Sequence, residues 1–368
     1  MKKVVFRVDA SYQIGTGHII RCLTLAKALK EKNTTCVFIC RENSGDLCKR
    51  IEGEGFKVLK LQKAHNKIIS DFSQTRLEHA EWLGVEQKVD AEETIQMISN
   101  SDSPDWLIVD HYGIDFEWEQ RLRPHVNKIM VIDDIADRQH DCDLLLDQNF
   151  GSSKKRYEGL VPSQCIQFHG PSYALLSPSF SRLRKSISAR DGRINRVLVY
   201  FGGGDDALEM IILTLEVFNS LDLKDIHLDI VIPKSFENHS SLKAALLKRG
   251  NAKIFSELPD LVELISQADL SIGAGGSTTW ERCCLGLPSL VISMASNQLP
   301  SCLALARDGY IFFLGLQTEV KSHIIRDFLK TLLKSPQSLQ NMSSHCLELV
   351  DGLGVSRIMG ELSPRLTQ

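Results

Sequence analysis

A histidine at the end of a glycine-containing turn is the first residue whose type and position could do chemistry. Residues 15–18 read Gly-Thr-Gly-His and stand between an apolar run at residues 4–8 and a segment with helical spacing of apolar residues. Gly17 allows close approach to the backbone, and the free N–H groups of a helix N-terminus bind anions. The helix macrodipole disfavours an imidazolium there, so a neutral His18 would accept a proton from water. The alternative is that His18 caps the helix or satisfies a buried carbonyl.

Asp110, His111 and Tyr112 form a second cluster, directly after an expected strand at residues 106–109. In open α/β sheets, ligands bind at the carboxyl ends of the strands, so these side chains should face the same site as His18. An acid, an imidazole and a phenol at a strand end serve equally well to fix a loop. The residues by themselves leave both interpretations open.

Four further carboxylates raise the question of a divalent metal ion, because hard cations need several oxygen ligands. They are Asp133, Asp134, Asp141 and Asp143. Aspartates at strand and turn ends are more often structural, so we expect neither a metal ion nor a cofactor. The ten cysteines contain no CxxC pair and no repeated Cys/His metal spacing, and most of them are expected to be reduced thiols in the core.

Two glycine turns in the second half could hold phosphate groups. Residues 202–204 are three glycines after an expected strand, and residues 273–281 join a later strand to a helix. Thr278 and Glu281 match a capping box, in which the hydroxyl and the carboxylate satisfy free backbone donors. A capping box does not account for the glycines before it. The other interpretation is that Glu281 accepts hydrogen bonds from ribose hydroxyls.

Asn297 and Gln298 follow an expected strand at residues 290–292. Their carboxamides offer both donors and acceptors, which could position the N-acyl group of a sugar or a water molecule. A role in a surface loop explains them equally well. The four tryptophans, Trp82, Trp106, Trp118 and Trp280, show no regular spacing and are interpreted as core or packing residues.

The elements that must position these residues have a doubly wound α/β pattern. Short apolar runs that end at turns or acidic residues alternate with helical segments, which predicts parallel sheets. The expected strands are residues 4–8, 36–40, 106–109, 129–132, 144–146, 197–201, 228–232, 270–272 and 290–292. We expect two Rossmann-like domains, at residues 1–185 and 194–345, that face each other across a ligand cleft, followed by a tail at residues 346–368.

Composition excludes several classes of protein. The chain has 368 residues, of which 43 are basic and 46 acidic, giving a formal charge of −3. No overall positive field exists to hold nucleic acid or anionic lipid. The longest apolar stretch, near residues 283–295, is shorter than the ~18 residues of a membrane span and contains Gly286 and Pro288. A cytoplasmic enzyme or binding protein is expected.

Together these blocks resemble a known family. Residues 8–11, 14–18, 21–26, 110–114, 133–138, 142–149, 173–176 and 273–288 are similar to motifs of the UDP-2,4-diacetamido-2,4,6-trideoxy-β-L-altropyranose hydrolases of pseudaminic acid biosynthesis. The family has the two-domain GT-B fold and is similar to the N-acetylglucosaminyltransferase that makes lipid II. Ser177 departs from the family, which has Arg after its Tyr-Ala-Leu-Leu or Tyr-Ala-Leu-Ile block, and this puts a contact to the substrate or the hinge in doubt.

The resemblance implies roles for particular residues. His18 would be the general base that activates water, which attacks the anomeric carbon with inversion and releases UDP without a metal ion. The implied sugar site includes Gly17, Arg21, Tyr112, Asn297 and Gln298. The implied UDP site includes Gly203, Gly204, Gly276, Ser277, Thr278 and Glu281.

Three other functions remain open from the sequence. A glycosyltransferase of the same fold would need an acceptor site. A metal-dependent pyrophosphatase would use the four aspartates named above and release UMP. A nucleotide-sugar sensor would bind UDP-sugars without turnover, and the histidine argues modestly against it.

Overall fold

The computed structural model describes residues 2–63, 77–99, 102–203, 206–221, 223–256 and 258–363. The chain forms two units, of which the first is Met1–Leu175 with Gly354–Gln368 and the second is Leu176–Leu353. The boundary therefore lies at Leu175, before the 185–194 segment expected from the sequence. The expected tail also divides differently, because the chain returns to the first unit at Gly354.

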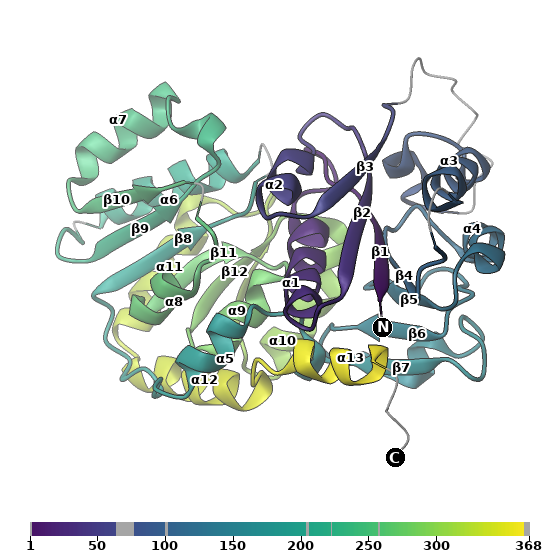
Figure 1. Ribbon diagram of the computed structural model, residues 1–368. Helices are drawn as coiled ribbons and strands as arrows, with labels where there is room; N and C mark the ends of the chain where they lie inside the picture. The colour runs from purple at the N-terminus through teal and green to yellow at the C-terminus, as the bar shows by residue number, and fades with distance from the viewer. Residues whose placement is uncertain are drawn as a thin grey trace. The chain divides into compact units, whose positions relative to one another are not determined.

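The first unit contains a parallel sheet in the order β3-β2-β1-β4-β5-β6-β7 (Figure 1). The strand order reverses between β1 and β4, which is where doubly wound sheets bind ligands. Val8 is paired with Asp110 at the carboxyl ends of these two strands. The strands are Lys3–Val8 (β1), Thr35–Arg41 (β2), Lys57–Leu61 (β3), Trp106–Asp110 (β4), Ile129–Ile132 (β5), Leu144–Asp147 (β6) and Ile166–His169 (β7).

Helices cover this sheet and connect its strands. The α-helices are Gly17–Glu31 (α1), Cys48–Gly53 (α2), Gln87–Ser99 (α3), Phe116–Leu122 (α4) and Gly354–Leu362 (α13). The 3-10 helices are Ala80–Leu83 (η2), Arg123–His125 (η3), Lys154–Tyr157 (η4) and Pro171–Tyr173 (η5). Helix α13 packs against this unit through Ile358 and Leu362, and the indole nitrogen of Trp106 donates a hydrogen bond of 3.0 Å to the Leu362 carbonyl.

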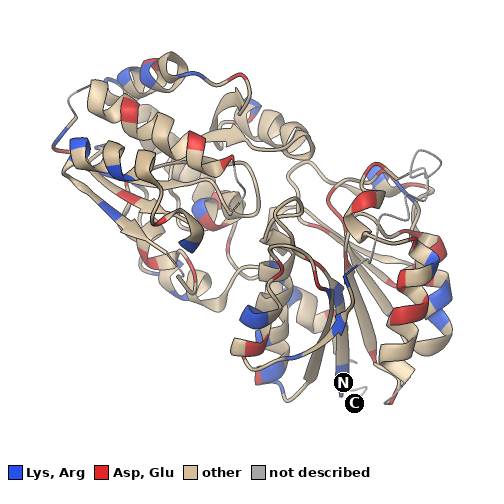
Figure 2. Cartoon of the chain, turned by 90° about the horizontal axis from the view of Figure 1, so that it is seen from above, with Lys and Arg blue, Asp and Glu red and all other residues tan. Residues whose placement is uncertain are grey.

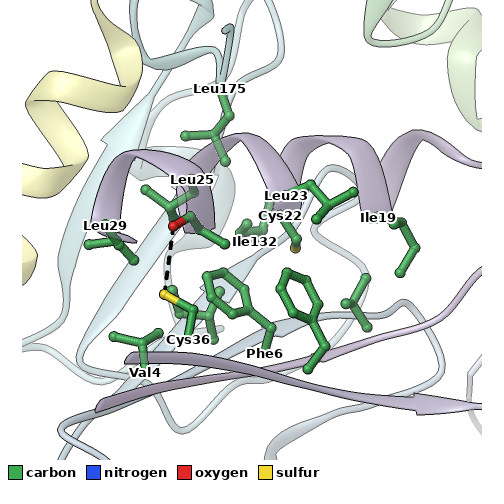
Figure 3. Close-up of a cluster of buried hydrophobic side chains, with 14 of the residues drawn as sticks. Val4, Phe6, Ile19, Cys22, Leu23, Leu25, Leu29, Cys36, Ile132 and Leu175 are labelled. Atoms are coloured by element: carbon green, nitrogen blue, oxygen red, sulfur yellow. Dashed lines mark hydrogen bonds between the residues drawn. The ribbon is translucent and has the colours of Figure 1, made fainter. Parts of the chain in front are cut away.

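Helix α1 is held by one apolar face. Ile19, Cys22 and Leu29 of this helix are at most 1 % exposed and belong to a buried cluster that includes Phe6 of β1. Figure 3 shows these side chains directed from α1 toward the strands. This packing fixes the rotation of α1 about its axis, and therefore the position of the polar residues in its first turn.

The second unit repeats the same topology. Its sheet has the order β10-β9-β8-β11-β12-β13, with all pairs parallel. The strands are Arg196–Tyr200 (β8), His227–Val231 (β9), Ala252–Phe255 (β10), Leu270–Ala274 (β11), Ser289–Ser293 (β12) and Phe312–Leu316 (β13). The helices are Pro178–Arg184 (α5), Ala207–Ser220 (α6), Lys234–Phe236 (η6), Ser240–Arg249 (α7), Val262–Gln267 (α8), Thr278–Cys284 (α9), Ser296–Gln298 (η7), Leu299–Arg307 (α10), Ser322–Leu333 (α11) and Pro336–Leu349 (α12).

The predicted fold class is confirmed, and each of the nine expected strands coincides with a strand to within two residues at either end. Strands β3, β7, β10 and β13 were not predicted, and they are the edge strands of the two sheets. All ten cysteines are buried and free, as predicted for most of them. Within the described residues, no helix is long and apolar enough to cross a bilayer. Basic and acidic residues are interspersed over both units (Figure 2).

Candidate functional site

His18 lies at the point of the first sheet where the strand order reverses. It is the second residue of α1, follows the loop after β1, and is 9 % exposed. No side chain caps α1, and its first turn contains no acidic residue. The alternative that His18 serves as the helix cap is therefore wrong, since Thr16 is the N-cap residue and His18 points to β4.

Asp110 and Arg21 hold the imidazole of His18. The Nδ1 atom of His18 lies 2.6 Å from Oδ1 of Asp110. Arg21, one turn further along α1, donates from Nε and Nη2 to the two oxygens of Asp110, each at 2.6 Å. Cys22 donates a longer hydrogen bond of 3.5 Å to the same carboxylate. The carboxylate is therefore surrounded by donors from one helix.

The charge of Asp110 determines which nitrogen of His18 carries the proton. Burial alone would raise the pKa of Asp110, but the Arg21 guanidinium and His18 outweigh burial and hold this pKa well below its usual range. An anionic acceptor at Nδ1 favours the tautomer of neutral imidazole with its proton on Nδ1. Nε2 of His18 then carries a lone pair, and it makes no hydrogen bond to the residues that the structure describes.

Tyr112 lies beside His18, as the sequence predicted. The two ring centroids are 4.8 Å apart with the planes at 80°. The Tyr112 hydroxyl donates to Asp134 at 2.8 Å, and Asp134 also accepts from Arg21 at 2.5 Å. Tyr112 is 5 % exposed. Arg21 thus joins two carboxylates beside His18, and direct contacts of Arg21 and Tyr112 with a sugar stay predictions.

Two aromatic residues beside Tyr112 were not predicted to belong to the site. Trp82 lies over Tyr112 with ring centroids 5.6 Å apart and planes at 26°, and His79 lies 4.4 Å from Trp82 and 5.5 Å from Tyr112. Both residues belong to the segment of η2, far from every motif in the sequence. The interpretation as core residues fits Trp106, Trp118 and Trp280, which are buried, whereas Trp82 is only partly buried and packs against Tyr112 and His79.

His111 serves the alternative function of fixing a loop. It is 3 % exposed, and its Nδ1 accepts a hydrogen bond of 3.0 Å from the backbone N–H of Gly113. Its Nε2 faces Asp9, at 3.3 Å. Burial lowers the pKa of His111, and the nearby Asp9 only partly offsets this effect. A neutral, buried ring in this position orders the loop after β4.

All four aspartates considered as metal ligands are engaged by arginines, including Asp134, which pairs with Arg21 as described above. Arg138 pairs with Asp133 at 3.0 Å. Arg123 pairs with Asp141 at 3.1 Å and with Asp143 at 2.5 Å. Across the described ranges, no three histidine, cysteine, aspartate or glutamate side chains lie close enough together to hold a metal ion.

In the second unit, the turn after β11 does not form the capping box that was one of the two interpretations of Thr278 and Glu281. Helix α9 begins at Thr278, its N-cap residue is Ser277, and no side chain makes a capping hydrogen bond. Gly275 is required for packing, because a Cβ there would collide with Sγ of Cys302. Glu281 is thus not engaged in capping.

Two oxygens near this turn lack partners. Glu281 Oε2 and Asn297 Oδ1 are buried atoms with no hydrogen-bond partner among the described residues. Burial raises the pKa of Glu281 to about 7. Gln298 borders the same turn, since a Cβ at Gly276 would lie 3.6 Å from its Nε2, and its Oε1 accepts from the backbone N–H of Met294 at 3.0 Å. Buried polar atoms without partners indicate a place for a polar ligand.

Three residues singled out in the sequence remain to be placed: Gly203, Gly204 and Ser177. Gly203 lies in the bend after β8, and Gly204 lies outside the described residues. Ser177 is the N-cap residue of α5, and its Oγ accepts from the backbone N–H of Ser179. A serine in this position caps a helix, which the arginine expected from the family could not do.

Comparisons with known proteins are consistent with this architecture. No protein-family model matches the chain. Three curated relatives are similar to it. The UDP-2,4-diacetamido-2,4,6-trideoxy-β-L-altropyranose hydrolase of Campylobacter jejuni is 27 % identical over 84 % of this chain and 97 % of its own length. The spore coat polysaccharide biosynthesis protein SpsG of Bacillus subtilis is 24 % identical over 95 % of this chain and 94 % of its own length. The uncharacterized protein MJ1062 of Methanocaldococcus jannaschii is 26 % identical over 79 % of this chain, which spans only 55 % of that protein.

Structural alignment with solved proteins identifies the fold of this chain. MurG of Acinetobacter baumannii aligns with a TM-score of 0.66 at 12 % identity, covering 98 % of this chain and 99 % of MurG. The calicheamicin glycosyltransferase CalG4 aligns with a TM-score of 0.63 at 12 % identity over the whole of both chains. The chain therefore has the GT-B fold, and the resemblance to the UDP-diacetamido-trideoxy-altropyranose hydrolases that its motifs indicated is confirmed over 84 % of the chain.

Proposed function

We propose that this protein hydrolyses a UDP-linked 2,4-diacetamido-2,4,6-trideoxyhexose, releasing UDP and the free sugar as a step of pseudaminic acid biosynthesis. The observation that carries the proposal is the pair formed by His18 and Asp110. It leaves Nε2 of His18 without a partner in the described part of the chain, at the reversal point of the sheet. A neutral imidazole held in this way can remove a proton from water as the water attacks the anomeric carbon.

Asp110 has two roles in this scheme. It holds the ring so that Nε2 is the accepting nitrogen, and it stabilises the imidazolium that forms when His18 takes the proton. Arg21 balances the charge of Asp110 when His18 is neutral, because the guanidinium donates two hydrogen bonds to this carboxylate. The proton moves from water to Nε2, the bond from water oxygen to the anomeric carbon forms, and the bond from this carbon to the UDP oxygen breaks.

The second unit would bind UDP. Glu281 Oε2 is a buried acceptor without a partner in the described residues, and two ribose hydroxyls are donors that would satisfy it. Gly276 and Ser277 form the adjacent turn and Thr278 begins α9, so that backbone donors there would meet the phosphates. Gly203 is proposed to contribute from the bend after β8, and Gly204, which lies outside the described residues, is proposed from the sequence alone. Asn297 is proposed to meet the sugar or the attacking water with its amide oxygen, which has no hydrogen-bond partner among the described residues.

This mechanism uses no metal ion. UDP is a good leaving group, and the charge that develops on its β-phosphate can be met by preorganised hydrogen-bond donors. The arginines that engage Asp133, Asp141 and Asp143 leave the pyrophosphatase alternative without a set of free carboxylates among the residues described.

A glycosyltransferase is the second candidate, because the whole chain aligns with CalG4, the calicheamicin glycosyltransferase. The sequence similarity to a named hydrolase favours water as the acceptor. Both activities would use His18 as the base, and they differ in the molecule that it deprotonates. Turnover measured with and without candidate sugar acceptors separates them, because a transferase hydrolyses its donor slowly and speeds up when an acceptor is added.

Turnover in ¹⁸O-labelled water tests the proposed function. A panel of UDP-sugars is incubated with the protein in the presence of a chelator, and the ¹⁸O content of each product is measured by mass spectrometry. The expected result is one ¹⁸O atom in the free sugar and none in UDP. Label in a phosphate product, or release of UMP, would establish P–O cleavage and overturn the proposal. Tight binding of UDP-sugars without any turnover would establish a sensor instead.

A further inference from the structure

Trp82 differs from the other three tryptophans of the chain. Trp106, Trp118 and Trp280 are at most 5 % exposed, whereas Trp82 is only partly buried. Leu83, the next residue of η2, is fully buried and packs in the core of the first unit, in a cluster from which Trp82 is absent. Leu83 thus anchors η2, and the large ring of Trp82 is left to cover something other than the core.

Trp82 covers Tyr112 and lies beside His18 in the candidate site. It lies nearly parallel to Tyr112, with centroids 5.6 Å apart, and it approaches His18 edge-on at 6.4 Å. His79 completes the group at 4.4 Å from Trp82. Tyr112, the sugar contact predicted from the sequence, is 5 % exposed and its hydroxyl is bound to Asp134. Trp82 and His79 therefore offer more accessible ring surface beside His18 than Tyr112 does.

Backbone contacts hold the segment that carries these two rings in place. The Trp82 N–H donates to the His79 carbonyl at 3.1 Å, and Gly84 ends η2 in the left-handed conformation with φ of 75°. The same His79 carbonyl lies against Gly113, where a Cβ would come within 2.9 Å of it. The loop after β4 and the segment of η2 therefore meet closely, and this contact requires a glycine. A fixed aromatic surface is suited to selective contact because little side-chain entropy is lost on binding.

We propose that Trp82 and His79 form an aromatic contact surface for the sugar of the substrate, and that Trp82 determines which sugars are accepted. This inference rests on the proposed function, since it requires the sugar to lie beside His18. Burial lowers the pKa of His79, so the ring is uncharged near neutral pH and adds to an apolar surface.

The chemistry of the sugar matches such a surface. A 2,4-diacetamido-2,4,6-trideoxyhexose has a methyl group at C6 and a methyl group on each acetamide, where common hexoses have hydroxyls. Aromatic side chains bury such groups favourably, and ligand sites are lined mainly by apolar and aromatic residues. One methyl group in an apolar pocket discriminates between substrates by about 10- to 200-fold. Trp82 would therefore favour the trideoxy sugar over a sugar with a C6 hydroxyl.

Intrinsic fluorescence tests whether Trp82 meets the sugar. Titrations use the His18→Ala variant, so that the substrate is not consumed, and compare it with the double variant that also carries Trp82→Phe. The difference between the two variants is the Trp82-dependent signal. We expect UDP-diacetamido-trideoxyhexose to produce such a signal and UDP alone to produce none. Trp106→Phe is the matched control, because this buried tryptophan should leave the signal intact. The same emission change in both variants, or an equal Trp82-dependent signal with UDP alone, would overturn the proposal.

Steady-state kinetics test selectivity. Trp82→Ala should lower kcat/KM for the trideoxy substrate by about 10- to 200-fold, lower it much less for UDP-N-acetylglucosamine, and leave inhibition by UDP unchanged. Trp82→Phe should retain most activity, and Leu247→Ala, at a residue 86 % exposed on the second unit, is the control. Unchanged kinetics in Trp82→Ala would overturn the role of Trp82 and leave the hydrolase proposal standing. A wild-type protein that hydrolyses no UDP-sugar would overturn the proposed function, while the fluorescence titration still decides on Trp82.

Discussion

The Nδ1 atom of His18 and the Oδ1 atom of Asp110 lie 2.6 Å apart, although 92 residues separate them in the sequence. The pairing of Val8 with Asp110 explains how they meet, because it places the end of β4 beside the end of β1 and thus beside the first turn of α1. The sheet topology, and not a local motif, therefore creates the pair. One carboxylate sets the orientation of the imidazole, and this imidazole is the base of the proposed mechanism.

The first prediction concerns the base. Replacing His18 by alanine should lower kcat by about 10²- to 10⁴-fold, the usual contribution of general base catalysis. The affinity for UDP should stay nearly unchanged, because the substitution removes an interaction of the transition state and not of the bound nucleotide. Steady-state kinetics and titration calorimetry measure the two quantities, with His239→Ala at an exposed position as the control. Full turnover in His18→Ala would refute the assignment.

The second prediction concerns Asp110. Replacing it by asparagine keeps the shape of the side chain and removes its charge, so Nδ1 of His18 no longer faces an anion and Arg21 loses a buried partner. We expect kcat to fall by about 10²- to 10⁴-fold, as in hydrolases whose histidine loses its carboxylate. Breaking a buried ion pair costs about 3–5 kcal/mol, so the free energy of unfolding should fall in denaturant titrations. An active variant of unchanged stability would contradict both roles.

Asp110→Asn should also change how the free energy of unfolding depends on pH in acid. The pKa of Asp110 is lower in the folded state than its ordinary value of 3.8, so the ionised carboxylate stabilises the fold above that pH. This contribution is lost progressively as the pH falls below 3.8. In Asp110→Asn, the free energy of unfolding should therefore depend less steeply on pH in this range than in the wild type. Equal slopes would show that Asp110 is not held in its charged form.

The sequence was sufficient for the main architecture because the central strands are continuous apolar runs that end in polar residues. Residues 129–132 are an example, with four fully or almost fully buried side chains. The missed strands β3, β7 and β10 carry exposed residues, such as Ile166 at 47 %, and lack a clean apolar run. An outer strand has a partner on one side only, so its sequence resembles that of a loop.

The candidate site was predictable only where a motif marked it. His18, Arg21 and Tyr112 stand in recognisable blocks, and the structure brings them together. Trp82 and His79 stand in a segment without a motif, and their proximity to Tyr112 depends on how η2 packs against the loop after β4. The one signal that could have indicated this contact is Gly113, which the packing requires.

The third prediction tests that contact. Alanine at Gly113 would place a Cβ 2.9 Å from the His79 carbonyl and 3.1 Å from the His111 ring, so one of these neighbours must move. Overpacking of this kind costs about 1–3 kcal/mol. We expect a lower free energy of unfolding, together with a higher KM for the trideoxy substrate if η2 shifts. Gly53→Ala is the matched control, since a Cβ at this last residue of α2 would meet nothing within 4 Å. Equal stability of the two variants would contradict the close packing at Gly113.

The fourth prediction concerns Glu281 and pH. Burial raises its pKa to about 7, so the carboxyl group of the free protein is half protonated near neutral pH. If Glu281 accepts hydrogen bonds from both ribose hydroxyls, the nucleotide binds the ionised form better, and binding should release protons. The Kd for a UDP-sugar should then rise about tenfold for each pH unit below 7 and become constant above it. A UDP-sugar is the correct probe, because its diphosphate does not titrate in this range whereas the terminal phosphate of UDP does.

Calorimetry measures this pH dependence. The His18→Ala background prevents turnover of the UDP-sugar, and the additional substitution Glu281→Gln serves as the comparison. This double variant should bind more weakly above pH 7, by about 1.5–3 kcal/mol, and should show no pH dependence. The same pH dependence with and without Glu281→Gln would show that another group titrates, and that Glu281 does not hold the ribose.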